Sequence, residues 1–250
     1  MRVRASSLAA FFVLAGGVVG ARGAPILIQD YEPPGNFDAP FNLAPDFSGT
    51  TVGVISTTDT LTHVPTDGAA GTTASAEMFM EHNTAESPTA AGWQWQVRFL
   101  PNSGGSNNAT NPLFAADGYV GYFLKVDPSV TANMQTAPVL EGSTGTGTAT
   151  AGILRDVIKD GQWHLYQWNM DDPAEFPGTF NTVYSGGLGD TTLEDMVSFD
   201  SIALVSPNGG NATVRIDEIV YDNAGPIPEP GIATVAGVAA SLLGVRRRGR

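Results

Sequence analysis

The stretch FDSIALVSPNGGNATVRIDEIVYDN, which runs from Phe199 to Asn223, contains two runs of alternating apolar and polar residues. A cluster of turn-forming residues, Pro207–Gly210, separates the two runs. Alternation with a period of two is typical of a half-buried strand, and Gly and Asn favour tight connections. The stretch therefore predicts two strands, near Val197–Leu204 and Thr213–Tyr221, joined by a tight connection.

The same pattern recurs along the chain, while helical periodicity is almost absent between its two ends. Six further strands are predicted, at Ile26–Tyr31, Thr51–Ser56, Ala74–Met80, Trp93–Leu100, Tyr119–Val126 and Trp163–Met170. We expect a short helical turn at Ile153–Lys159 or Thr192–Met196, and a mobile loop at the low-complexity segment Glu141–Ala151. Eight strands with long loops favour an all-β fold, a two-sheet antiparallel sandwich or jelly roll.

The N-terminus has the features of a secretory signal peptide. Arg2 and Arg4 form a positive region, and Ala5–Gly20 is a run of apolar and small residues. Small-residue cleavage sites follow after Ala21 and after Gly23. We therefore expect residues 1–23 to be a signal peptide, which predicts export.

The C-terminus ends in an uncharged run of 15 residues, Gly231–Val245, and a basic tail, residues 246–250. At a rise of ~1.5 Å per residue a helix of this run reaches ~22 Å, less than the ~30 Å hydrocarbon core of a bilayer. A C-terminal helix of a soluble domain is the alternative. Three prolines precede the run and four arginines end the chain, which favours a short transmembrane helix with the arginines inside and the rest of the chain outside.

Together these C-terminal features resemble the bacterial PEP-CTERM sorting signal. The motif is Pro228-Glu229-Pro230, followed by the apolar run and the arginines. The resemblance implies that residues 226–250 are a sorting signal, processed by a membrane-embedded exosortase that removes or exchanges the helix. It also implies delivery to a cell envelope or an extracellular matrix rich in polysaccharide. Residues 24–225 remain as one β-sandwich domain.

The composition of this domain limits its partners. It holds 24 acidic residues and five basic ones, an excess of 19 negative charges. This excludes nucleic acid, whose affinity depends on Lys and Arg that neutralise phosphates, and it favours cations over anions. The chain has no cysteine, so it contains no disulfide, no thiolate metal site and no cysteine nucleophile.

Three stretches of the domain resemble galactose-binding-like jelly rolls, a group that includes many carbohydrate-binding modules. They are IQDYEPPGN (residues 28–36), DGQWHLYQWNMDD (residues 160–172) and the stretch from Phe199 to Asn223, which resembles the closing hairpin of that group. Laminin-G-like and concanavalin-like sandwiches are the rival fold. The resemblance implies a structural Ca²⁺ held by Glu32 and Asp217, because hard oxygen ligands suit this ion. The alternative is that Asp217 is an ordinary strand-end charge.

Alternation along three strands suggests which side chains face a ligand. In GWQWQVRFL we expect Trp93, Trp95, Val97 and Phe99 to point inward. Sugars pack their C–H faces on aromatic rings and pair their hydroxyls with amides and charges. The candidate ligand contacts are Gln94, Gln96, Arg98, Tyr119, Tyr166 and Trp168. The alternative is that the tryptophans form the core and the polar residues only coat a solvated sheet.

Catalysis has little support in the sequence. His63, His82 and His164 belong to no HExxH motif, and no GxSxG nucleophile elbow occurs. We therefore expect an exported, non-catalytic protein of the envelope or matrix that associates with polysaccharide. The alternatives are a structural surface protein without a defined ligand, or a glycan-active hydrolase or lyase.

Overall fold

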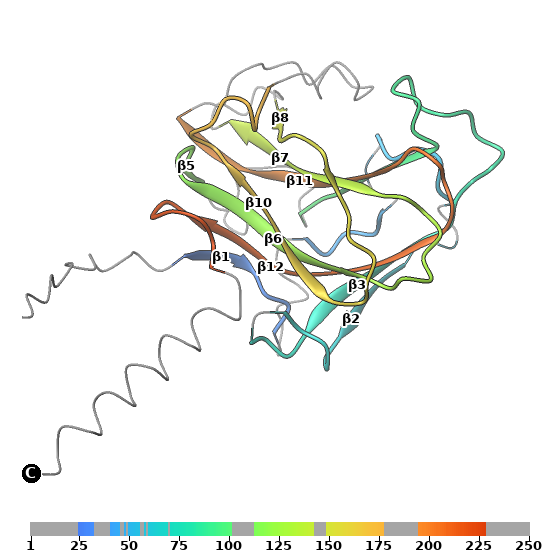
Figure 1. The fold of residues 1–250 in the computed structure, drawn as a ribbon, viewed down its shortest axis with the longest axis horizontal. Coiled ribbons are helices and arrows are strands. Elements are labelled where there is room, and N and C mark those ends of the chain that lie inside the picture. The colour runs from blue at the N-terminus through green and yellow to red at the C-terminus, as the bar shows by residue number, and fades with distance from the viewer. Residues whose placement is uncertain are drawn as a thin grey trace, which may run out of the picture.

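The computed structural model describes residues 25–32, 41–45, 48, 50–55, 58, 60–69, 71–101, 113–142, 149–177 and 195–228. These residues form an all-β sandwich of two antiparallel sheets, as expected from the alternation (Figure 1). Sheet A has the order β10-β6-β12-β3-β2, with β1 also paired to β12. Sheet B has the order β4-β11-β7-β8, with β5 paired to β11 and β9 to β7.

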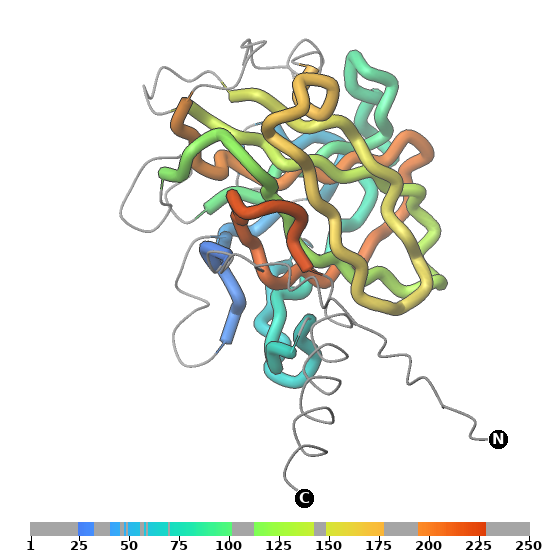
Figure 2. Tube along the Cα trace, turned by 60° about the vertical axis from the view of Figure 1, so that its left-hand side comes forward, coloured from blue at the N-terminus to red at the C-terminus, as the bar shows by residue number. Residues whose placement is uncertain are grey.

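The strands have the following bounds. Sheet A consists of β1 (Ile26–Gln29), β2 (Thr60–Val64), β3 (Ser75–Met80), β6 (Tyr119–Val126), β10 (Trp163–Asn169) and β12 (Ala212–Asp222). Sheet B consists of β4 (Trp95–Phe99), β5 (Phe114–Ala115), β7 (Gln135–Gly142), β8 (Ala149–Ala151), β9 (Arg155–Asp156) and β11 (Met196–Ser206). From β5 onward the chain crosses repeatedly between the layers, and Figure 2 shows β1 (blue) beside the end of β12 (red).

Large apolar side chains fill the space between the two sheets. Trp95 of β4 and Trp168 of β10 are both fully buried in this core. A polar link also crosses it, because the Tyr122 hydroxyl lies 2.7 Å from Oγ1 of Thr136, which in turn donates to the carbonyl of Ala203 at 2.9 Å. Buried polar groups in proteins are usually hydrogen-bonded, and these bonds connect β6 of sheet A with β7 and β11 of sheet B.

Seven of the eight predicted strands are present, with ends that differ by a few residues. The exception is Thr51–Ser56, of which residues 51–55 are described. These form only isolated bridges, from Val52 to Gln96 in sheet B and from Val54 to His82 next to sheet A. The prediction of helical turns was wrong for the described parts, because Ile153–Lys159 contains β9 and Met196 begins β11. Residues 192–194 lie outside the described residues.

The segment Glu141–Ala151 was expected to be a mobile loop, but both of its ends belong to strands. Glu141 and Gly142 end β7, and Ala149–Ala151 form β8; residues 143–148 lie outside the described part. Pro138 makes β7 hard to recognise in the sequence, because proline has no backbone N–H donor and is rare in inner strands. Its carbonyl accepts from the Gly152 N–H at 2.9 Å, in the gap between β8 and β9. The missing N–H therefore falls where the ladder is interrupted.

Most features of the two chain ends lie outside the described residues. This holds for the signal peptide and its cleavage sites, for Glu229 and Pro230, for the apolar run and for the basic tail. Pro228 is described and is exposed. Within the described ranges, no helix has the length and apolar character needed to cross a membrane.

Candidate functional site

The outward face of sheet A carries a continuous row of functional side chains. Strand register places Trp163 opposite Lys125, Lys125 opposite Arg215, and Arg215 opposite Glu77. Glu77 lies opposite Thr62, so the row crosses all five strands of the sheet path. At ~4.8 Å between neighbouring strands, the four steps give the row a length of roughly 19 Å. This is the size of an extended ligand rather than of a single small molecule.

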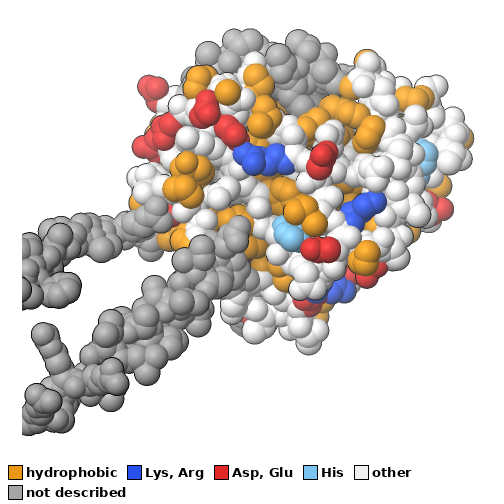
Figure 3. All heavy atoms as spheres, viewed as in Figure 1, with side chains coloured by type: hydrophobic (Ala, Val, Ile, Leu, Met, Phe, Trp, Pro, Cys, Tyr) orange, Lys and Arg blue, Asp and Glu red, His pale blue; other side chains and the backbone are white. Residues whose placement is uncertain are grey.

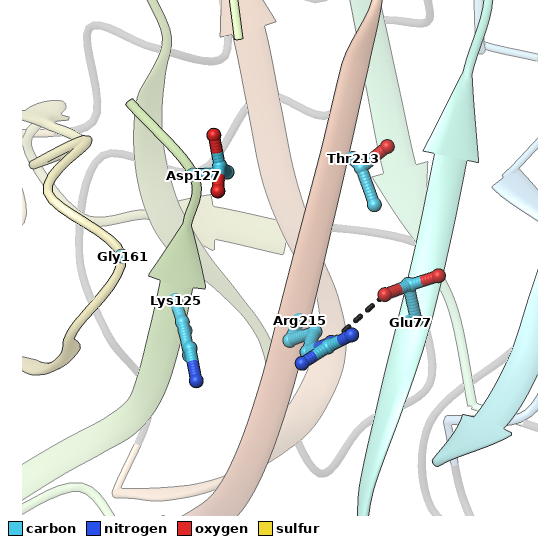
Figure 4. A pocket seen from close by; sticks show the side chains of 6 residues that line it. All are labelled: Glu77, Lys125, Asp127, Gly161, Thr213 and Arg215. Atoms are coloured by element: carbon cyan, nitrogen blue, oxygen red, sulfur yellow. Dashed lines mark hydrogen bonds and ion pairs between the residues drawn. The ribbon is translucent and has the colours of Figure 1, made fainter. Parts of the chain in front are cut away.

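A groove of about 530 Å³ lies over the middle of this row. Figure 4 shows its lining: Lys125 and Asp127 from β6 and its end, Thr213 and Arg215 from β12, Glu77 from β3, and Gly161 before β10. The side chains point outward from neighbouring strands, because residues two apart in a strand lie on the same face. Half-buried Phe79 faces the same side and is paired with Thr213.

Asp67, in the loop between β2 and β3, connects the members of the row. Its two carboxylate oxygens both accept from Lys125 Nζ at 2.9 Å, and Oδ2 also accepts from Arg215 Nη1. Trp163 Nε1 lies 3.4 Å from Oδ1, and Lys125 Nζ lies 5.9 Å from the centroid of the Trp163 ring. Asp67 therefore holds both cations and the indole in one arrangement.

Charge pairing sets the electrostatics of the groove. Partial burial works to raise the pKa of Asp67, but the hydrogen bonds from Lys125 and Arg215 outweigh it and hold the pKa below its ordinary value. Arg215 Nε also donates to Glu77 Oε2 at 2.8 Å. Both cations of the groove are thus neutralised by carboxylates of the chain itself. What remains for a ligand is a dense set of donors and acceptors beside the partly exposed Trp163.

The two candidate aromatic contacts on β10 lie on the inner face, which corrects their assignment to a binding surface. Trp168 is fully buried and donates from Nε1 to the Ile153 carbonyl at 2.8 Å. The Tyr166 hydroxyl accepts from the Ile158 N–H at 2.8 Å. Neither ring is open to a surface ligand. The outward residues of the strand are Trp163, Leu165, Gln167 and Asn169.

Of the three candidates near β4, Gln96 and Arg98 belong to sheet B and Gln94 directly precedes the strand, so the structure does not unite them with the row on sheet A. Gln96 and Arg98 are buried. Gln96 Nε2 donates to the Thr50 carbonyl at 2.5 Å, and Arg98 pairs with Asp200 and donates from Nε to Ser201 Oγ at 3.1 Å. Gln94 is half-buried. The Arg98 guanidinium and Gln96 Nε2 thus have partners within the chain, whereas Gln96 Oε1 is buried without a hydrogen-bond partner.

Tyr119 and Trp93 lie at or just before the ends of their strands, away from the row. Tyr119 is half-buried on the outward face of β6, but six residues from Lys125, which is roughly 20 Å along the strand. Trp93 was expected to point inward with Trp95, but it packs in a separate cluster with Val139, Ala203 and Val205. It precedes β4, so the alternation of that strand does not extend to it.

The two expected calcium ligands, Glu32 and Asp217, both accept hydrogen bonds within the chain. Both oxygens of Glu32 accept from Thr73, and Oε1 also accepts from the Ala74 N–H at 3.0 Å. Asp217 Oδ2 accepts from the Ala69 N–H at 2.7 Å and from Thr72, and Oδ1 accepts from the Glu218 N–H at 2.8 Å. Each carboxylate thus accepts three hydrogen bonds within the chain, and a Ca²⁺ ion would compete with these donors for the carboxylate oxygens. Among the described residues, no group of three or more acidic or histidine side chains could hold a metal ion.

Sheet topology and groove together define an all-β sandwich with a polar, aromatic-flanked groove on the outside of one sheet. No family model matches the chain, and no curated protein matches its sequence.

Among solved structures, the chain is similar to a family 11 carbohydrate-binding module from Clostridium thermocellum in complex with a β-1,3-1,4-mixed-linked tetrasaccharide. The identity is 13% and the TM-score 0.41, over 70% of this chain and 87% of that one. It is also similar to a family 29 carbohydrate-binding module, with 12% identity and a TM-score of 0.29, over 66% and 88% of the two chains. Similarity this low does not transfer a ligand or a function to this chain.

Proposed function

We propose that this chain is an exported, non-catalytic protein of the cell envelope or extracellular matrix, and that it binds polysaccharide on the outer face of sheet A. The observation that carries the proposal is the row from Trp163 to Thr62, with its groove. Sugar hydroxyls both donate and accept, and the row offers both kinds of partner. The flanking indole suits the C–H face of a sugar ring.

The state of the groove carboxylates supports a binding role over a hydrolytic one. A glycosidase needs a carboxylic acid of raised pKa beside a second carboxylate. In the groove, Asp67 has a lowered pKa and Glu77 is paired with Arg215. Asp217, whose pKa burial raises to about 7, has no exposed surface. Over the described part of the chain, the groove therefore supplies hydrogen bonds rather than an acid and base.

Export and sorting are supported by the sequence of the two ends. The positive and apolar N-terminal region, the motif at residues 228–230 and the final arginines are the supporting features. In this proposal the apolar run holds the chain in the inner membrane only until an exosortase acts. Mass spectrometry of the mature protein tests it, because a peptide with Leu242 and Leu243 on exported material would show a lasting anchor.

Replacing Trp163 with alanine should weaken glycan binding by roughly tenfold or more, since the loss of an aromatic side chain that packs on a ligand typically costs about 2 kcal/mol. Affinity electrophoresis in gels that contain a neutral polysaccharide, such as hydroxyethylcellulose or a mixed-linkage β-glucan, measures the change. Trp163→Phe keeps a ring and should retain most of the binding.

Addition of EDTA should leave glycan binding unchanged, because the carboxylates of Glu32 and Asp217 already accept hydrogen bonds within the chain.

If a glycan retained the wild type and Trp163→Ala equally, the row would not be the binding surface. No retention on any glycan would favour the alternative of a structural surface protein. Release of reducing ends from extracted exopolysaccharide would favour the hydrolase or lyase.

A further inference from the structure

We infer that the groove selects uncharged polysaccharides and that Asp67 is the residue that sets this selectivity. The inference rests on the proposed glycan binding and names the ligand class for the same groove. Basic side chains that face outward from a sheet, as Lys125 and Arg215 do, would ordinarily attract the acidic glycans of a matrix. A preference for uncharged glycans is therefore not expected from the position of these two residues alone. Figure 3 shows how few and scattered such basic side chains are on one face of the molecule.

The two basic side chains that line the groove are both paired with carboxylates. Lys125 is held by both oxygens of Asp67, and Arg215 is held by Asp67 on one side and Glu77 on the other. All four side chains are between 23% and 32% exposed, so the pairs are partly shielded from water. An acidic sugar would have to displace a carboxylate that is already in place.

The charged side chains in and beside the groove do not cancel completely. Asp127 lines the groove as well, and hydrogen bonds from Ser129 hold its pKa below the ordinary value. With Asp67, Glu77 and Asp127 against Lys125 and Arg215, the groove carries one net negative charge. An anionic ligand would therefore meet repulsion as well as occupied cations, which is how a site rejects a competing ligand class.

The paired side chains still offer hydrogen-bond donors and acceptors to a neutral sugar. A guanidinium has more N–H donors than the contacts of Arg215 employ, and ionised carboxylates accept from several directions. Hydroxyls can therefore bind at the rims of the ion pairs without breaking them. The Thr213 side chain lies on the same face. The pairs thus act as fixed arrays of hydrogen-bonding groups rather than as free charges.

Asp67→Asn tests this inference. The substitution replaces the carboxylate by a neutral amide of similar shape, so Lys125 loses its anionic partner. Affinity electrophoresis would compare the wild type and the variant on neutral glycans, hydroxyethylcellulose and mixed-linkage β-glucan, and on acidic ones, polygalacturonate and alginate. We expect the wild type to bind neutral glycans only, and Asp67→Asn to gain at least roughly tenfold in affinity for an acidic glycan, a gain that high salt abolishes.

Two further variants keep the test decisive. Asp156→Asn, on exposed β9 of sheet B, makes the same change of charge away from the groove and should alter nothing. Glu77→Gln removes one of the two carboxylates that pair with Arg215 and leaves the loop of Asp67 unchanged. It should therefore shift selectivity in the same direction even if Asp67→Asn does not fold. Unchanged selectivity in both groove variants would overturn the inference.

The wild type itself separates the inference from the proposed function. Preference for acidic glycans would overturn the inference and leave glycan binding intact. Failure to bind any of the four polysaccharides would overturn both.

Discussion

Replacing Trp168 with alanine should lower the free energy of unfolding by about 3–5 kcal/mol, the usual cost of removing a large aromatic side chain from a core. The indole is fully buried and its centroid lies 5.4 Å from that of Tyr122. It also donates to the Ile153 carbonyl, and the Arg155 guanidinium lies 5.2 Å from its ring centroid. Urea denaturation at 25 °C measures the loss.

Trp163→Ala is the matched control, because it removes the same side chain from the opposite face of the same strand. This variant should cost about 1 kcal/mol or less, as is usual for a partly exposed position without a core contact. If Trp163→Ala proved the more destabilising of the two, β10 would present its other face to the core. The binding surface proposed above would then be wrong.

Asp217→Asn should remove a large part of the pH dependence of stability. Burial raises the pKa of Asp217 from its ordinary 3.8 to about 7, against hydrogen bonds from Thr72, Ala69 and Glu218 that work to lower it. A folded-state pKa above the unfolded one gives stability that is complete below about pH 4 and is lost as pH rises through 7. From pH 5 to pH 8 the wild type should therefore lose about 2–3 kcal/mol through this group.

The measurement is the free energy of unfolding at pH 5 and at pH 8, for wild type and variant. Taking the difference between the two pH values cancels any hydrogen bond that asparagine fails to make to the Glu218 N–H. Glu218 itself has a pKa raised to about 7 by burial and by Asp30, so some pH dependence should persist in the variant. Asp156→Asn, at an exposed position, should retain the whole slope. An equal slope in wild type and Asp217→Asn would show that this carboxyl ionises normally.

Much of the fold follows from alternation in the sequence. The two strands of the closing stretch were predicted within one or two residues of β11 and β12, and β6 was predicted with its observed ends. The expected hairpin between β11 and β12 was wrong, because β11 pairs with β4 and β7 in sheet B whereas β12 pairs with β3 and β6 in sheet A. The inner strand β7 was missed because Pro138 is tolerated only where the neighbouring ladder is interrupted, and pairing of this kind is not visible in one strand alone. The short strands β5, β8 and β9 are set by their partners rather than by their own pattern.

The candidate site was harder to predict, because β10 has large side chains on both faces. Trp163 and Leu165 alternate with Tyr166 and Trp168, so periodicity alone does not say which set faces inward. Register with β6 decides, since Trp168 lies opposite the core residue Val120 and Trp163 opposite Lys125. The outward lysine at position 125 was the one available signal. Asp67 lies in a loop, where strand periodicity has no information to give.

Amide chemical shifts recorded during titration with a neutral oligosaccharide test the central claim most directly. Our account predicts that the changes concentrate in β3, β6, β10 and β12, around Glu77, Lys125, Trp163 and Arg215, and that sheet B is unaffected. Changes centred on Gln96 and Arg98 of β4 would place the ligand on the other sheet and contradict the account.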